Sequence, residues 1–155
     1  MKVSLNIVRS LINFELPSVD ELVLRVNQQL GRVEEVIDLG AKYSGARIVR
    51  VVECGKHPDA DRLSVTKIDD GGAVPDVPRD DNGYVQVVCG APNVHADMWA
   101  IWLPPGSTVP VSFDDTEPFV LGARPLRGVL SQGMLAAADE LAIGTDHKGI
   151  IEITE

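Results

Sequence analysis

Aromatic residues are scarce in this sequence, which has three Phe, two Tyr and two Trp among its 155 residues. A folded core must therefore depend mainly on Val, Ile, Leu and Ala. Two cysteines, Cys54 and Cys89, are too few for a disulfide framework, so we expect free thiols in a reducing compartment. No apolar run reaches the roughly 18 residues of a membrane helix, and Asn6 and Arg9 interrupt the only run near the start. We expect a cytoplasmic protein that does not enter a membrane.

Basic residues are also outnumbered, with 14 Lys and Arg against 23 Asp and Glu and a net charge of −9. Such a chain repels phosphate at long range, which counts against a simple nucleic-acid binder. The acidic excess is uneven, because the segments 69–83 and 113–118, both predicted loops, account for the net charge of residues 41–155. Salt screens charges beyond about 8 Å. Cations away from these loops either form one positive face or are an ordinary solvated surface.

Residues 1–40 carry the pattern of a strand, a helix and a second strand. Alternating apolar residues predict a strand in residues 1–12, and residues 33–39 predict another. Between them, Ser18 followed by Glu21 forms a capping box at a helix start, and Gly31 is suited to ending that helix. We therefore predict a strand–helix–strand half-domain over residues 1–40, which is too small to bury a core alone.

Residues 41–155 contain short β-rich runs separated by Gly, Pro and Asp. The predicted strands are 45–54, 62–69, 83–89, 97–103 and 119–128, and the predicted helical turns are 92–96 and 136–141. Five short strands with a small helical insert match the strand count of an OB-fold. The predicted fold class is mainly β, with a five-stranded OB-fold barrel over residues 41–155 preceded by the α/β piece.

The sequence offers no catalytic centre. No Gly-rich phosphate loop is present, and Ser131 lacks a plausible His–Asp relay. Cys54, His57, Cys89 and His95 have side chains that could bind zinc, but their spacing matches no common zinc motif. We predict no catalytic residues and no metal. Trp99 and Trp102 are candidates for base stacking. They lie on opposite faces of one predicted strand, however, so at least one of them should be in the core.

Four segments recur together in one known family. They are residues 56–63 (KHPDADRL), 88–94 (VCGAPNV), 127–135 (RGVLSQGML), and 140–144 with 146–150 (ELAIG and DHKGI). In this order and spacing they resemble the tRNA-binding OB-fold of the endothelial-monocyte-activating-polypeptide type. That module occurs in bacterial phenylalanyl-tRNA synthetase beta subunits, in many methionyl-tRNA synthetases and as free tRNA-binding proteins.

Residues 1–40 resemble the start of the phenylalanyl-tRNA synthetase beta subunit, so the resemblance covers essentially the whole chain. It implies a non-catalytic tRNA-binding or structural module that supports aminoacylation of tRNA with phenylalanine in the full enzyme. The implied partners are tRNA, specifically tRNA-Phe, the synthetase alpha subunit and the remainder of the beta subunit. ATP and Mg²⁺ are implied for the full enzyme, and no cofactor for this fragment.

The candidate RNA contacts are Lys56, Arg62, Lys67, Asn93, Arg124, Arg127, Ser131 and Met134. The cations suit phosphate. Asn93 suits either a turn cap or a base edge, and Ser131 suits a phosphate. Met134 either packs against a nucleotide or fills the barrel. Gly133 is expected where backbone segments approach closely.

Two alternatives stay open from the sequence. The first is a stand-alone, structure-specific tRNA-binding protein. The second is a structural OB-fold spacer without RNA contacts, which the acidic loops favour. Ala136 and Ala137 also favour it, because the resembling family often has Cys or Ser just after the third motif.

Overall fold

The computed structural model describes residues 1–154. The chain divides into two compact units, one spanning Met1–Asp38 and a larger one that begins at Leu39.

The first unit consists of helices α1 (Leu5–Leu11) and α2 (Val19–Gln29). The predicted capped helix is confirmed as α2, because the Ser18 hydroxyl oxygen accepts a hydrogen bond from the Glu21 backbone N–H at 3.3 Å. This bond satisfies one of the free N–H groups at a helix start.

The two strands expected in this unit are a wrong prediction. Helix α1 occupies the first expected strand, and residues 33–38 form neither helix nor strand. In a segment this short the apolar residues fit the period of a strand and that of a helix. Val3, Leu5 and Ile7 alternate as in a strand, whereas Leu5, Val8 and Leu11 recur every third residue as in a helix. A strand also needs a partner for its backbone hydrogen bonds, whereas a helix satisfies them internally.

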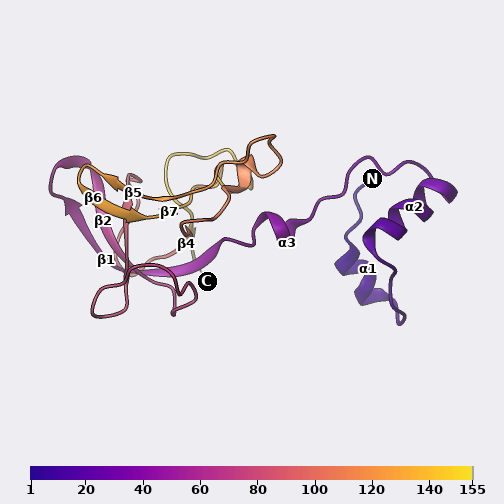
Figure 1. Cartoon of the computed structure of the whole chain (residues 1–155), viewed down its shortest axis with the longest axis horizontal. Coiled ribbons are helices and arrows are strands. Elements are labelled where there is room, and N and C mark those ends of the chain that lie inside the picture. Colours follow the sequence, from indigo (N-terminus) through magenta and orange to yellow (C-terminus); the bar gives the residue numbers. More distant parts are fainter. Residues whose placement is uncertain (155) are drawn as a thin grey trace. The chain divides into compact units, whose positions relative to one another are not determined.

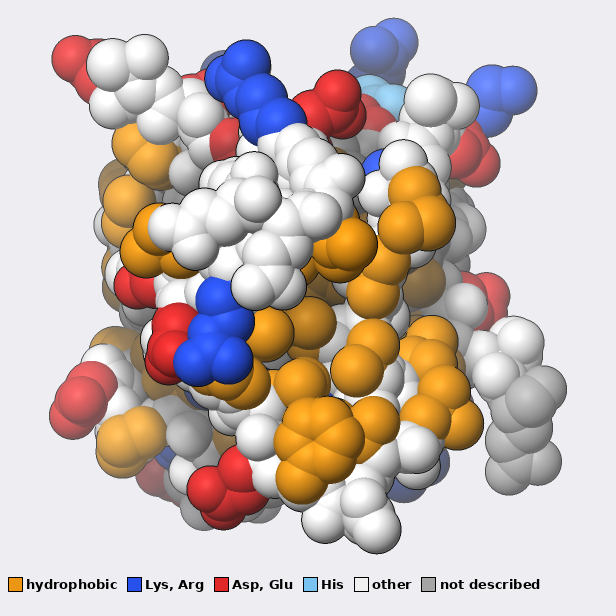
Figure 2. All heavy atoms as spheres, turned by 90° about the vertical axis from the view of Figure 1, so that its right-hand side faces the viewer, with side chains coloured by type: hydrophobic (Ala, Val, Ile, Leu, Met, Phe, Trp, Pro, Cys, Tyr) orange, Lys and Arg blue, Asp and Glu red, His pale blue; other side chains and the backbone are white. Residues whose placement is uncertain are grey.

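Neither α1 nor α2 has a buried residue. Figure 2 shows hydrophobic side chains gathered on the surface that faces the viewer. The large apolar side chains exposed in this unit are those of Met1, Val3, Ile7, Leu11, Phe14, Leu24, Leu30, Val36 and Ile37. The unit thus leaves much of its apolar surface in contact with solvent, as expected for a piece too small to form a core.

The second unit is built from antiparallel strands (Figure 1). Its strands are β1 (Arg47–His57), β2 (Ala60–Asp69), β3 (Val85–Cys89), β4 (Trp99–Leu103), β5 (Ala123–Leu126), β6 (Val129–Gln132), β7 (Met134–Leu135) and β8 (Glu152–Ile153). Within the described residues, the main sheet has the order β3-β2-β1-β4-β7, and β8 pairs with β4. A short helix α3 (Leu39–Lys42) precedes β1, and a 3₁₀ turn (Pro110–Ser112) follows β4. The predicted fold class, mainly β and OB-like, is confirmed.

The later part of this unit differs from the sequence prediction in detail. The expected strand 119–128 is shorter, and β6, β7 and β8 were not predicted as strands. Segments 92–96 and 136–141, predicted as helical turns, form hydrogen-bonded turns. Gly133 and the turn before β6 divide this region into strands of two to four residues, which are too short for a clear alternating pattern.

The core lies between the strands and is rich in Val. Val49, Val51, Val85 and Val87 are fully buried together with Trp102. The indole N–H of Trp102 donates to the backbone oxygen of Gln132 at 2.8 Å, which satisfies its one polar group. Trp99 on the opposite face is 49% exposed. The prediction that at least one Trp belongs to the core is therefore confirmed.

Gly133 joins β7 to β6 and brings β6 beside β3. Its φ is +74°, and a Cβ placed on it would lie 2.0 Å from the backbone oxygen of Leu103. The expected close approach of backbone segments is confirmed. Beyond this bend, the Gln86 side-chain amide donates to the Leu130 carbonyl at 2.9 Å, and the Ser131 hydroxyl oxygen accepts from the Val88 N–H at 2.9 Å. These bonds hold the β5–β6 hairpin against the edge of β3.

Candidate nucleic-acid interface

The β1–β2 hairpin presents two of the predicted phosphate contacts. Its turn is Pro58-Asp59, between the paired residues His57 and Ala60. Proline fixes φ at the first turn position, which suits this tight connection. Lys56 and Arg62 flank the turn, and both side chains are exposed.

The β5–β6 hairpin presents two more of the predicted phosphate contacts. Leu126 pairs with Val129, so the turn is Arg127-Gly128, with φ values of +49° and +86°. Two positive φ values are typical of a type I′ hairpin turn, whose twist matches that of the strands. Arg127 is exposed at this turn, and Arg124 is exposed on β5.

His57 connects the two hairpins. Its Nδ1 accepts a hydrogen bond from the Asp59 backbone N–H at 3.1 Å, so the neutral ring carries its proton on Nε2. That N–H donates to the backbone oxygen of Leu126, 3.0 Å away. His57 is only 5% exposed. The imidazole therefore fixes the two turns, and with them Lys56, Arg62 and Arg127, within one region. From the sequence, His57 was a candidate only for a zinc site.

Four predicted cations have no acidic partner in the part of the chain that the structure describes. They are Lys56, Arg62, Arg124 and Arg127. Four other cations of this unit, Lys42, Arg50, Lys67 and Arg79, each pair with an aspartate, as Arg50 does with Asp97 at 2.7 Å. The acidic residues Asp59 and Asp61 are exposed on the β1–β2 hairpin and oppose the cations there. The unpaired cations are free to bind an anion such as phosphate.

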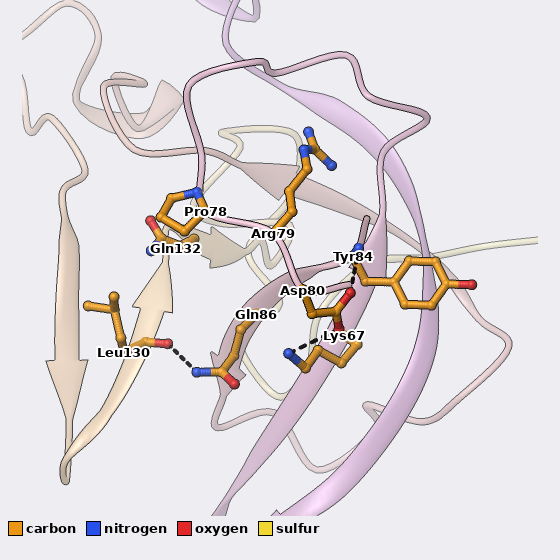
Figure 3. A pocket seen from close by; sticks show the side chains of 8 residues that line it. All are labelled: Lys67, Pro78, Arg79, Asp80, Tyr84, Gln86, Leu130 and Gln132. Atoms are coloured by element: carbon orange, nitrogen blue, oxygen red, sulfur yellow. Dashed lines mark hydrogen bonds and ion pairs between the residues drawn. The ribbon is translucent and has the colours of Figure 1, made fainter. Parts of the chain in front are cut away.

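Lys67 lies apart from these tips, on β2, at the rim of a cavity (Figure 3). Its ammonium nitrogen is 3.2 Å from a carboxylate oxygen of Asp80. The cavity has a volume of about 200 Å³ and is lined by Lys67, Pro78, Arg79, Asp80, Tyr84, Gln86, Leu130 and Gln132. It lies on strands β2 and β3 beside β6. In OB-folds this face of strands 2 and 3 is where oligonucleotides bind.

The remaining predicted contacts are occupied by protein groups. Both ends of the Asn93 side-chain amide bond to Ile150, donating to its carbonyl at 2.9 Å and accepting from its N–H at 3.0 Å. Ser131 is 1% exposed, and its hydroxyl donates to the Gly133 carbonyl at 2.9 Å besides accepting from β3. Met134 is half-buried and packs against a second apolar cluster. These three residues stabilise the fold.

The acidic loop before β3 is held by a buried ion pair. The Arg79 guanidinium binds both carboxylate oxygens of Asp70, at 2.7 and 3.0 Å, and the Asp70 side chain is 0% exposed. Burial alone would raise the pKa of Asp70. Hydrogen bonds from Arg79 and from the backbone N–H groups of Val74 and Gly72 outweigh that effect and lower it. The loop that covers one side of the cavity is thus ordered by its own charges.

No metal-ligating group of three or more His, Cys, Asp or Glu side chains occurs within residues 1–154. Burial raises the pKa of the Cys89 thiol, which favours the neutral form over the thiolate that a metal would need. No helix among the described residues is long and apolar enough to cross a membrane.

The comparisons with known proteins agree with this geometry. Residues 46–155 match the family model described as "Putative tRNA binding domain". Similar proteins include phenylalanine–tRNA ligase beta subunits. That of Nitrobacter winogradskyi is 40% identical over 78% of this chain. Those of Cereibacter sphaeroides and Bacteroides thetaiotaomicron are 38% and 36% identical over 100% and 97%.

The chain spans only 14% of the Nitrobacter subunit and 18% and 17% of the other two. It is thus homologous to a fragment of these subunits, as the motifs in its sequence indicated. Because the family model covers more than two thirds of the residues, the chain belongs to the tRNA-binding domain family, in the form found in phenylalanine–tRNA ligase beta subunits.

Proposed function

We propose that the second unit binds tRNA phosphates through the tips of its β1–β2 and β5–β6 hairpins. The observation that carries the proposal is the His57 bridge, which holds Lys56, Arg62 and Arg127 near one another without acidic partners in the described chain. Arg124 extends the same hairpin along β5. Cations placed on a rigid scaffold fix a phosphate backbone without reading its sequence.

In the whole enzyme, this module supports aminoacylation of tRNA with phenylalanine by helping to capture or orient the tRNA. The tRNA is tRNA-Phe, and the protein partners are the alpha subunit and the remainder of the beta subunit. In this proposal, ATP and Mg²⁺ act in the full enzyme. A cytoplasmic location stays a prediction.

The test is the salt dependence of tRNA binding by the 155-residue chain. The logarithm of the association constant falls with the logarithm of the salt concentration, by about 0.7–0.9 for each phosphate contacted. We expect Arg127→Asn to weaken binding and to lower this slope by about one contact. Asparagine tolerates the positive φ of Arg127, so the turn is preserved.

Arg127→Lys is the matched control, because it keeps the charge at the same position and should leave the slope unchanged. A slope that Arg127→Asn does not alter contradicts the phosphate role. No measurable tRNA binding even at low salt favours the structural-spacer alternative. The stand-alone alternative receives less support, because the similar beta subunits are all much longer than this chain.

A further inference from the structure

The cavity beside Lys67 contains two amide side chains with unused hydrogen-bonding capacity. Gln132 is only 4% exposed, and its side-chain amide makes no hydrogen bond to any residue that the structure describes. Gln86 uses its amide N–H with Leu130, and its Oε1 has no donor within residues 1–154. Among the described residues, Asp139 Oδ1 alone is a fully buried side-chain oxygen or nitrogen without a partner, so the free amide atoms of Gln132 and Gln86 reach the accessible surface of the cavity. A ligand with both donors and acceptors would satisfy these groups.

The walls of the cavity are suited to a flat ring. Pro78, Tyr84 and Leu130 contribute to a lining that is largely apolar, and Leu130 is 43% exposed. Figure 3 shows Gln86 reaching toward β6 and Leu130 from the β3 side, with Gln132 beside Pro78. A volume of about 200 Å³ is below the 300–1,000 Å³ typical of sites for drug-sized ligands. It suits one heteroaromatic ring system whose edge meets the amides.

The charges at this cavity disfavour a phosphate. Its two cations are already neutralised, Lys67 by Asp80 at 3.2 Å and Arg79 by the fully buried Asp70. A phosphate placed here would have to displace a carboxylate. This distinguishes the cavity from the hairpin tips, where the cations are unpaired.

We propose that the cavity binds one unstacked base of a single-stranded RNA segment, and that the amides of Gln132 and Gln86 read the edge of that base. This rests on the proposed function and adds base recognition to an interface that otherwise binds phosphates. Glutamine amides pair with base edges through complementary donors and acceptors. Sequence-specific RNA binding commonly uses unpaired bases held in this way.

The experiment measures the affinity of the 155-residue chain for short RNA oligomers by fluorescence anisotropy. The probes are ten-nucleotide homopolymers of A, C, G and U and a ribose-phosphate oligomer without bases. The wild-type chain should bind one homopolymer about tenfold or more tighter than the abasic oligomer, the scale of one good amide–base pair. Gln132→Met keeps the side-chain volume and removes the amide. It should abolish this preference and leave the salt slope unchanged.

Gln28→Met in the Met1–Asp38 unit is the matched control and should change nothing. Gln86→Met provides a second variant at a half-buried position, should Gln132→Met fail to fold, and it should reduce the same preference. Salt-dependent binding that is equal for all five probes overturns the base pocket but leaves the phosphate interface standing. A base preference that survives both pocket substitutions also overturns it. Failure of every RNA to bind at low salt overturns the proposed function, and the pocket with it.

Discussion

Asp70 and Arg79 form a buried ion pair inside a segment that the sequence shows only as an acidic loop. From sequence, Arg79 is the one cation in an acidic run that was predicted to be a loop. In the structure it also donates to the backbone oxygens of Val74 and Gly83, at 2.7 and 2.9 Å, so it ties the loop at several points. Sequence pattern does not reveal such a pair, because the two residues are nine positions apart and no periodic element connects them.

Asp70→Asn is expected to destabilise the chain at neutral pH by about 3 kcal/mol, since it leaves Arg79 without its buried counter-charge. Because the folded-state pKa of Asp70 is lowered, its contribution is complete above the unfolded-state value of 3.8. It is lost as the pH falls through the folded-state pKa. Urea unfolding from pH 7 to pH 2 checks both points. A variant as stable as the wild-type chain at pH 7 would show that the pair contributes nothing.

At the scale of elements, the sequence predicted well wherever one element is long enough to show its period. Strands β1 and β2, each ten residues or longer, and the capped helix α2 were all found near their predicted positions. The strand expected at α1 failed because seven residues fit either period. Strands β6 and β7 were missed because Gly133 interrupts them after a few residues.

In the candidate site, the sequence identified residues that local turn signals mark and missed those whose partners are distant in the chain. Exposed cations next to turn residues were identifiable from sequence, because Gly and Pro mark the hairpin tips. The roles of Asn93 and Ser131 were not, since their partners Ile150 and Val88 lie 57 and 43 residues away. His57 and Gln132 were not recognised as site residues for the same reason. The bond from His57 to Leu126 and the position of Gln132 in the cavity depend on long-range packing that no local pattern encodes.

Gly133→Ala tests the bend that closes the sheet. The new Cβ would overlap the Leu103 backbone oxygen, and alanine disfavours a φ of +74°. We expect a loss of about 3 kcal/mol or more in the free energy of unfolding. Gly128→Ala is the control, because Gly128 has a similar φ of +86° but no atom within 4 Å of the added Cβ. It should cost only about 1 kcal/mol. Equal unfolding midpoints for the two variants would contradict the close approach.

At the scale of the whole molecule, the acidic net charge and tRNA binding are compatible because much of the acidic excess lies in the segments 69–83 and 113–118. The acidic loop before β3 neutralises its own Arg79 and pairs Lys67 with Asp80. Lys56, Arg62 and Arg127, which have no acidic partner among the described residues, lie at the hairpin tips connected by His57. Screening over about 8 Å at physiological salt weakens repulsion from more distant carboxylates. The net charge of −9 therefore predicts modest affinity and strong salt dependence, not an absence of binding.

The most direct test of this account is to map the backbone amide signals of the 155-residue chain by NMR while unmodified tRNA-Phe is added at low salt. We expect the largest changes at the two hairpin turns, around Lys56–Arg62 and Arg124–Val129, with smaller changes along β2 and β3. Changes confined to helix α2 or to the outer face of β4 around Trp99, with both hairpin turns unaffected, would contradict it.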